Sequence, residues 1–262
     1  MDDETEVAWP QYDDPELAGV WLDQVEGMWR EFNTDRQAFC RPQNDETPAE
    51  AFEVGLFATG LMASIMSTTR AQLVMVETGY VVESRAMFRS ILDQCLGMTE
   101  LERSRIAAVH AWGHAHAWNL NMFSRASTRG FDIGEVNREY IENFQQLASE
   151  NERTTAVNKA TNAIKITTIA QQGKLEAMMH QAWVEATPLS KTTMRLTDQY
   201  ARTEQVGDDK FRVLTFIDSD PDSVVDPRLV LAVILPPVLQ IYARIMGDDD
   251  LHGLITELRP AD

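Results

Sequence analysis

The segment 99–124 brings together the residue types that acid–base and phosphate chemistry would use. Its sequence, TELERSRIAAVHAWGHAHAWNLNMFS, predicts one uninterrupted helix, with Thr99 and Glu102 at the spacing of a capping box. At about 100° per residue, one flank of this helix carries a line of polar side chains. These side chains are Arg103, His110, His114 and Asn121. Such a line is compatible with a binding site or with a solvated helix face, and the sequence leaves both open.

Two arginines precede His110 at short spacings. Four residues separate Arg105 from His110, and six separate Arg103 from it. This pattern resembles the Arg-x(4–6)-His signature of the HEPN superfamily of small helical proteins, many of which are RNases in toxin and defence systems. The resemblance implies a metal-independent RNase that acts as a dimer. In that chemistry His110 would be the acid or base at the ribose 2′-hydroxyl, and Arg103 or Arg105 would stabilise the phosphate.

The histidines also raise the question of a metal site. His110 and His114 are one helical turn apart, so both could reach one ion. A helical di-iron site needs a Glu three residues before each His, and those positions hold Ala107 and Ala111. The sequence also lacks P-loop, GxGxxG and GxSxG motifs. We therefore expect neither a metal nor a cofactor.

A second polar flank is predicted on the helix that follows Gly79. Arg85, Arg89 and Asp93 are spaced by four residues among apolar neighbours. A guanidinium at the edge of a core suits bidentate pairing, so Arg89 is expected to form an ion pair that fixes how helices dock. The candidate carboxylates are Asp93, Glu83 and Glu77. The alternative is a binding site for an anion or substrate.

Two segments carry a further resemblance. Segment 77–94 ends one helix at a glycine and continues with Glu, Arg and Asp, here Gly79, Glu83, Arg89 and Asp93; segment 180–196 contains Leu189-Ser190. Both patterns resemble an uncharacterised bacterial family of all-helical domains of unknown function. In that family a histidine follows the Leu-Ser pair, whereas this chain has Thr192 and Thr193 there. The resemblance implies an all-helical fold without an assigned chemistry, and no activity that depends on that histidine.

Periodicity and capping signals predict an all-α fold, a single bundle of about seven or eight helices. The main helices are expected over 15–32, 47–77, 81–97 and 227–246, the last broken or kinked at Pro236-Pro237, with further helices over 154–203. A minor β element is expected near 210–217, where KFRVLTFI lies between turn residues. The predicted organisation is an acidic extended segment 1–14, a main bundle 15–203, an acidic loop or short hairpin 204–226 and C-terminal helices 227–262.

The charge distribution restricts the class of partner. The net charge is −18, made up of −12 in residues 1–55, +1 in 56–202 and −7 in 203–262. With 5 lysines and no basic run, binding to duplex DNA is not expected, although a small RNA site in the neutral centre stays open. A polar MDDETEV start and the lack of an 18-residue apolar run favour a cytoplasmic protein without membrane association. Cys40 and Cys95 are expected to be free thiols.

These patterns favour an intracellular interaction or regulatory protein that binds a protein partner or itself, in a bacterial or phage conflict setting by analogy alone. The alternative is the HEPN-like RNase, so whether the chain is an enzyme stays open. The two hypotheses differ in what should surround the same side chains. An RNase needs Arg103 or Arg105 beside His110 in a cleft, facing a two-fold mate. An interaction protein would hold these residues in ion pairs or leave them in solvent.

Overall fold

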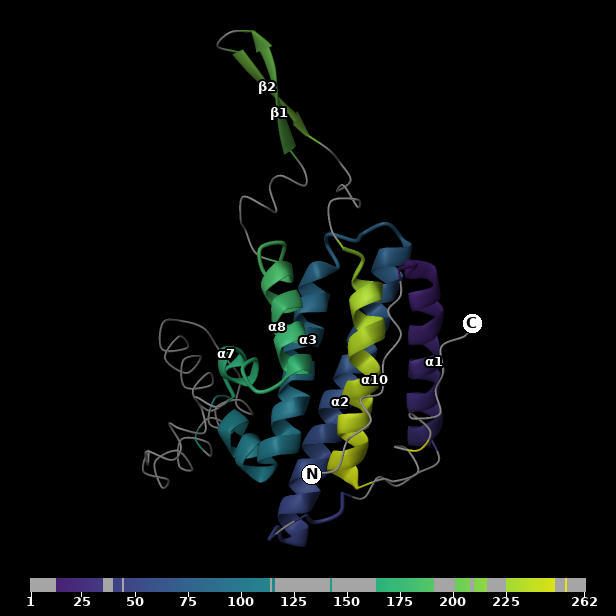
Figure 1. The fold of residues 1–262 in the computed structure, drawn as a ribbon, viewed down its shortest axis with the longest axis vertical. Coiled ribbons are helices and arrows are strands. Elements are labelled where there is room, and N and C mark those ends of the chain that lie inside the picture. Colours follow the sequence, from purple (N-terminus) through teal and green to yellow (C-terminus); the bar gives the residue numbers. More distant parts are fainter. Residues whose placement is uncertain are drawn as a thin grey trace.

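The computed structural model describes residues 13–34, 40–43, 45–113, 115, 142, 164–190, 201–207, 210–215, 225–247 and 253. Within these ranges the fold is all-α, as predicted, and its strands are confined to one two-stranded hairpin. The long helices run side by side, and the hairpin projects from one end of the bundle (Figure 1). The helices are α1 (Pro15–Thr34), α2 (Pro48–Glu77), α3 (Arg85–Ser104), α7 (Ile166–Ile169), α8 (Lys174–Ala186) and α10 (Pro227–Met246).

Helix α10 lies in the middle of this arrangement. It packs against α1, α2 and α3, while α8 packs against α3 and α7 contacts both α3 and α8 (Figure 1). The buried side chains of these helices form one continuous core, in which Trp21, Phe88 and Tyr242 are the largest fully buried members. The bundle is therefore built around α10, with α2 and α3 side by side on it.

Helix α2 begins and ends where its sequence predicts. The Glu50 amide donates to Thr47 Oγ1 at 3.3 Å and the Thr47 amide donates to the Glu50 carboxylate at 2.8 Å, which confirms the predicted capping box. Pro48 occupies the first turn, where its missing amide proton costs nothing. After Glu77 the chain turns at Gly79, whose φ of +91° favours glycine.

Helix α3 differs from the prediction. The expected helix end at Gly97 and the new start at Thr99 are wrong, because α3 continues through both residues to Ser104. Thr99 is buried and its hydroxyl donates to the Leu96 carbonyl at 2.9 Å inside the helix. A Cβ at position 97 would lie 3.5 Å from the Trp112 ring and 3.6 Å from Leu61. Both are ordinary van der Waals distances, so Gly97 lies in a packed stretch in the middle of a helix rather than at a helix end.

Helix α10 spans the predicted residues but is not broken at Pro236-Pro237. A proline at 236 leaves the Ala232 carbonyl without its usual helical donor, since that donor would be the amide of residue 236. The Trp21 indole of α1 supplies a replacement, with Nε1 donating to the Ala232 oxygen at 3.2 Å inside the core. The vacant helical acceptor is therefore satisfied by a neighbouring helix. At the other end Gly247, with φ +66°, closes α10 in the left-handed conformation.

The minor β element extends further than predicted. Strand β2 (Lys210–Thr215) confirms the strand expected near 210–217, and it pairs antiparallel with β1 (Ala201–Gly207). The start of β1 lies in the range predicted as helical bundle, so the predicted boundary at 203–204 is wrong for this hairpin. Pairing between two strands, rather than the local pattern of β1, decides this structure.

Two helices are long and apolar enough to cross a membrane by length and composition, although the sequence favoured no membrane association. In α10, 72% of the apolar window is buried, as is usual for the central helix of a packed protein. In α2 only 39% of the window is buried. Helix α2 is thus apolar on its core side and also on a side that faces outward.

The bond from Trp21 to Ala232 gives a test of how the prolines are tolerated. We expect Trp21→Phe to lower the free energy of unfolding by about 1–3 kcal/mol, because a buried carbonyl loses its donor. In a Pro236→Ala background the helix amide returns, so the same change should cost at least about 1 kcal/mol less. Urea unfolding of the four proteins measures this coupling. An equal cost in both backgrounds would show that the indole bond does not compensate for the proline.

Candidate functional site

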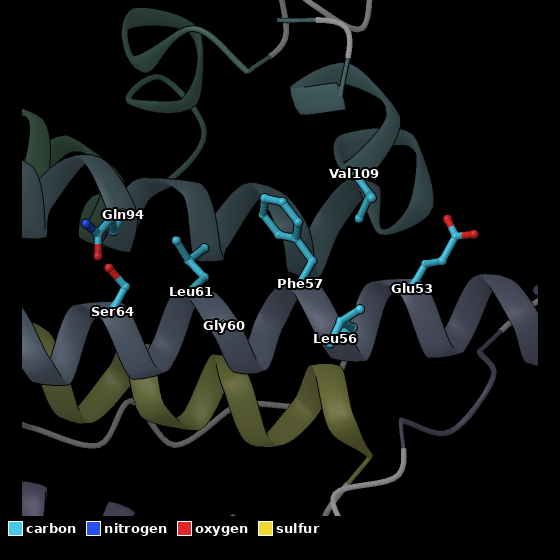
Figure 2. A pocket seen from close by; sticks show the side chains of 8 residues that line it. All are labelled: Glu53, Leu56, Phe57, Gly60, Leu61, Ser64, Gln94 and Val109. Carbon is cyan, nitrogen blue, oxygen red and sulfur yellow. The ribbon is translucent and has the colours of Figure 1, made fainter. Parts of the chain in front are cut away.

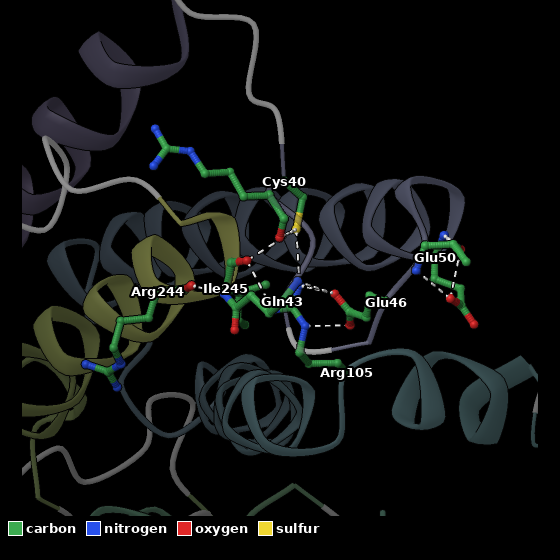
Figure 3. Close-up of polar contacts among 9 residues, drawn as sticks. Cys40, Gln43, Glu46, Glu50, Arg105, Arg244 and Ile245 are labelled. Atoms are coloured by element: carbon green, nitrogen blue, oxygen red, sulfur yellow. Dashed lines mark hydrogen bonds and ion pairs between the residues drawn. The ribbon is translucent and has the colours of Figure 1, made fainter.

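The end of α3 is fixed by a buried ion pair between Arg105 and Glu46. Arg105 Nε lies 2.6 Å from Glu46 Oε1 and Nη2 lies 2.8 Å from Oε2, so the guanidinium binds the carboxylate through two parallel bonds (Figure 3). Their side chains are 8% and 9% exposed. A pair this buried is held in place by its geometry, since an arginine fork matches both carboxylate oxygens. The hydrogen bond from Arg105 lowers the pKa of Glu46 below its ordinary value, so the carboxylate is ionised at neutral pH.

The same guanidinium joins the other chain segments that meet here. Nη1 donates to the Ile245 carbonyl at 3.2 Å, and Nη2 lies 3.5 Å from Cys40 Sγ (Figure 3). Cys40 donates to the Ile245 carbonyl at 3.2 Å, and Gln43 Nε2 donates to the Arg244 carbonyl at 2.8 Å. These bonds satisfy carbonyls in the last turn of α10, where the regular helical donors run out, although the Arg244 carbonyl also accepts from the Gly247 amide at 3.1 Å. One arginine therefore ties the end of α3 to the loop before α2 and to the end of α10.

Cys40 is a structural member of this cluster. Burial raises the pKa of its thiol, although the nearby Arg105 works in the opposite direction. A protonated thiol is a poor nucleophile. A Cβ at Gly55 of α2 would lie 2.4 Å from the Cys40 Cβ, so the glycine lets this loop approach the helix closely. The free thiols predicted from the sequence are both present, with Cys95 fully buried in the core.

Arg105 also breaks the helix. Its φ is +43°, the one positive φ of a residue other than glycine in the described ranges. The backbone bonds continue locally, with the Arg105 amide on the Leu101 carbonyl and the Ala108 amide on the Arg105 carbonyl, both at 2.9 Å. A new helical segment, 106–113, then starts in another direction. The predicted continuous helix 99–124 is wrong at this residue, because the bonds of the Arg105 side chain hold a backbone conformation that a regular helix excludes.

Segment 106–113 forms one wall of an apolar groove whose floor is α2. The Trp112 ring stacks on the Phe57 ring with centroids 4.9 Å apart and planes 5° apart. The groove has a volume of about 530 Å³. It is lined by Glu53, Leu56, Phe57, Gly60, Leu61 and Ser64 of α2, with Gln94 of α3 and Val109 of segment 106–113 (Figure 2).

The polar groups of the groove lie at its two ends. The Glu53 carboxylate stands at one end, and Ser64 and Gln94 point toward one another at the other (Figure 2). Gln94 Nε2 donates to Ser90 at 3.3 Å, but no donor in the described part of the chain bonds its buried Oε1 atom. Beside the groove, Phe52 and Leu56 are 66% and 65% exposed. The site is thus an open apolar surface with an acid at one end and an amide acceptor at the other.

The structure places the predicted catalytic residues in different surroundings. Arg103 donates to the buried Glu100 at 2.7 Å and to Glu176 of α8 at 3.1 Å, and so joins α3 to α8. Arg105 is held by Glu46, and His110 is exposed on the far side of the helix break. None of these three residues lines the groove. His114 and Asn121, the other members of the predicted line, lie outside the described residues.

The second predicted flank lies between α3 and α8. The Arg89 guanidinium lies over the Trp183 ring at 4.8 Å, and the buried Arg85 lies over Phe88 at 5.4 Å. Among the residues that the structure describes, no carboxylate bonds Arg89, so a cation–π contact stands in place of the ion pair expected with Asp93, Glu83 or Glu77. That contact still docks one helix on another, which is the structural role predicted for Arg89. The described ranges contain no group of three or more His, Cys, Asp or Glu side chains that could hold a metal ion.

No protein-family model, curated protein or solved structure matches this chain. The resemblances to the helical bacterial family and to the HEPN superfamily therefore stay predictions. The groove itself was not predicted from the sequence. The signal for it is present in α2, where Phe52, Leu56 and Val74 lie on the face opposite the buried residues.

Because of the positive φ at Arg105, we expect a glycine variant at this position to be more stable than an alanine variant. Arg105→Ala and Arg105→Gly both leave Glu46 without its partner, so both should lose several kcal/mol, about 3–5 by analogy with other buried pairs. At φ +43° alanine is strained and glycine is not, so the glycine variant should be the more stable by about 1 kcal/mol. Thermal and urea unfolding compare them. At Arg103, inside regular helix, the order should reverse; the same order at both positions would exclude backbone strain at 105.

The lowered pKa of Glu46 predicts an acid-sensitive contribution to stability. A carboxyl with a folded pKa below its unfolded value stabilises the fold above the unfolded pKa, near 4.5, and this contribution disappears as the pH falls through the folded value. We expect the unfolding free energy of the wild type to fall more steeply between about pH 5 and 3 than that of Glu46→Gln. Glu53→Gln, which removes an exposed carboxylate of α2, is the control and should keep the wild-type slope. Identical slopes for wild type and Glu46→Gln would contradict the assignment.

Proposed function

We propose that this protein is a helical interaction protein that binds a helical segment of a protein partner in the groove between α2 and segment 106–113. The observation that carries the proposal is the groove itself, an apolar surface of about 530 Å³ bordered by exposed Phe52 and Leu56. Large apolar side chains left together on a surface mark binding sites, because each loses contact with water when a partner covers it.

The shape and lining of the groove suit a helix better than a small molecule. Its floor is the outward side of a 30-residue helix, and Gly60 presents no side chain there, with nothing within 4 Å of a Cβ built on it. A partner helix can approach such a floor closely and place its apolar residues beside Leu56, Phe57 and Val109. Polar groups at the two ends, rather than in the centre, then fix its direction.

The surroundings of the arginines support the same function. Arg105 and Arg103 are both engaged in ion pairs that join helices, and His110 faces solvent. These are the surroundings expected of an interaction protein, whereas the RNase hypothesis requires an arginine beside His110 in a cleft. The ion pairs thus support a structural use of the side chains that resembled a catalytic motif.

A site-specific photo-crosslinker tests the proposal. Placed at Ala63, which is exposed on α2 beside the groove, it should label a helical segment of a defined partner in the protein's own cells. Leu56→Glu should abolish this product, since a charge replaces an apolar contact while the exposed position leaves the fold intact. The control crosslinker stands at Val184 of α8, which is 49% exposed. Equal labelling from both positions, or labelling that survives Leu56→Glu, would refute the groove as the binding site.

A further inference from the structure

The outward face of α2 continues past the groove along the helix. At about 100° per residue its exposed residues fall within one stripe. The N-terminal part of the stripe holds the large or acidic Phe52, Glu53 and Leu56. Small exposed residues follow, namely Gly60, Ala63, Ser64, Ser67 and Ala71, and the exposed Val74 and Glu77 end the stripe. Arg70 is 61% exposed within this second part and approaches Glu26 only at 3.9 Å.

This distribution is complementary to itself when two such helices run in opposite directions. If the two-fold axis passes between Leu61 and Met62, Leu56 of one helix faces Ser67 of the other, and Gly60 faces Ala63. Large side chains of one copy then meet small side chains of the second, and small residues at the crossing permit a close approach of the backbones. Glu53 then faces Arg70 of the second copy and Val74 faces the small Ala49, so opposite charges meet on both sides of the axis. The antiparallel direction also aligns the helix dipoles favourably.

We infer that the partner of the groove is a second copy of this chain, bound antiparallel through α2. The inference rests on the proposed interaction function and names its partner. A two-fold contact of this kind uses the same patch on both copies and closes as a dimer. The 39% burial of the apolar window of α2 is then explained, because its outward part is covered by the second α2.

The charges favour a second copy over a basic helix from another protein. The net charge of −18 would attract a basic partner, but between Ala49 and Val74 the exposed charges on the outward face of α2 are one acid, Glu53, and one base, Arg70. Arg70 would repel a basic helix at the end where it meets Glu53 of a second copy. The net charge instead opposes dimerisation through general repulsion. Added salt should therefore strengthen a dimer of this chain and weaken the binding of a basic helix.

The area sets the expected affinity. A 30-residue helix is about 45 Å long and about 10 Å wide, so its face offers roughly 450 Å² per copy, or roughly 900 Å² in total. The groove wall beside Val109 adds to this area. Such a contact lies at the small end of specific interfaces. We therefore expect a reversible dimer with a dissociation constant on the order of micromolar.

Sedimentation velocity of the full chain over a range of concentrations tests the inference. The wild type should pass from monomer to dimer, and Ala63→Arg should remain monomeric because it places a charge at the crossing. Glu53→Arg and Arg70→Glu should each weaken the dimer by about tenfold, since each creates two like-charge contacts per dimer. An equimolar mixture of these two variants should restore it, because each contact between them again joins opposite charges. Val184→Arg on α8 is the control and should dimerise like the wild type.

The outcomes separate this inference from the proposed function. A wild type that stays monomeric overturns the second copy as partner, while a crosslink from Ala63 to another protein would still uphold the groove. A dimer that persists in Ala63→Arg, or that the charge-swap mixture fails to restore, overturns the antiparallel α2 arrangement.

Discussion

The ion pair between Arg105 and Glu46 decides where α3 ends, and the position of the groove wall follows from it. The guanidinium is bonded to the loop before α2, to a carbonyl at the end of α10 and to the thiol of Cys40. These bonds hold Arg105 at a positive φ, so the chain leaves the axis of α3 and segment 106–113 turns over α2. Without that turn Trp112 could not lie on Phe57 while also packing against Gly97. The groove is thus a consequence of one strained residue whose side chain is satisfied on all sides.

Helix α2 contributes to both the core and the groove, because one of its faces packs in the core and the other presents an apolar surface to the outside. Its buried residues include Val54, Met62, Ile65 and Leu73, and they pack in the common core. Its exposed residues change along the helix from Phe52 and Leu56 to Gly60, Ser67 and Ala71. Glycine inside an exposed helix costs about 1 kcal/mol relative to alanine. Among the described residues no atom lies within 4 Å of a Cβ built at Gly60, so packing within this part of the chain does not explain that cost, and the proposed approach of another helix would.

The sequence predicts those features that depend on neighbours along the chain. The capping box at Thr47 and Glu50, the turn at Gly79 and the extent of α10 all follow from residues within a few positions of one another. The failures arise from distant partners. Arg105 leaves the helix conformation while its side chain bonds Glu46, which lies 59 positions away in the sequence. Helix α10 continues through its prolines because Trp21, which lies 211 positions from Ala232, donates to the Ala232 carbonyl. The interpretation of the Arg-His spacing rests on one helix from Thr99 onward, and the break at Arg105 separates Arg103 from the helical segment that carries His110. The outward face of α2 could have been found from helical periodicity alone, since Phe52, Leu56 and Val74 share one side of the helix.

A buried ion pair is a costly way to hold a loop, and its position explains why an apolar contact would not serve instead. Removing two charges from water costs several kcal/mol for each ion, so a well-packed apolar pair often gives equal or greater stability. An apolar side chain at position 105 could fill the same volume, but it would leave the Ile245 carbonyl at the end of α10 with only the weak thiol donor of Cys40. It would also lack the directional bonds that favour the positive φ over a continued helix. The main effect of the pair is therefore to fix the direction of segment 106–113, and its net contribution to stability is smaller. Because of that direction, the bundle has an open groove on α2.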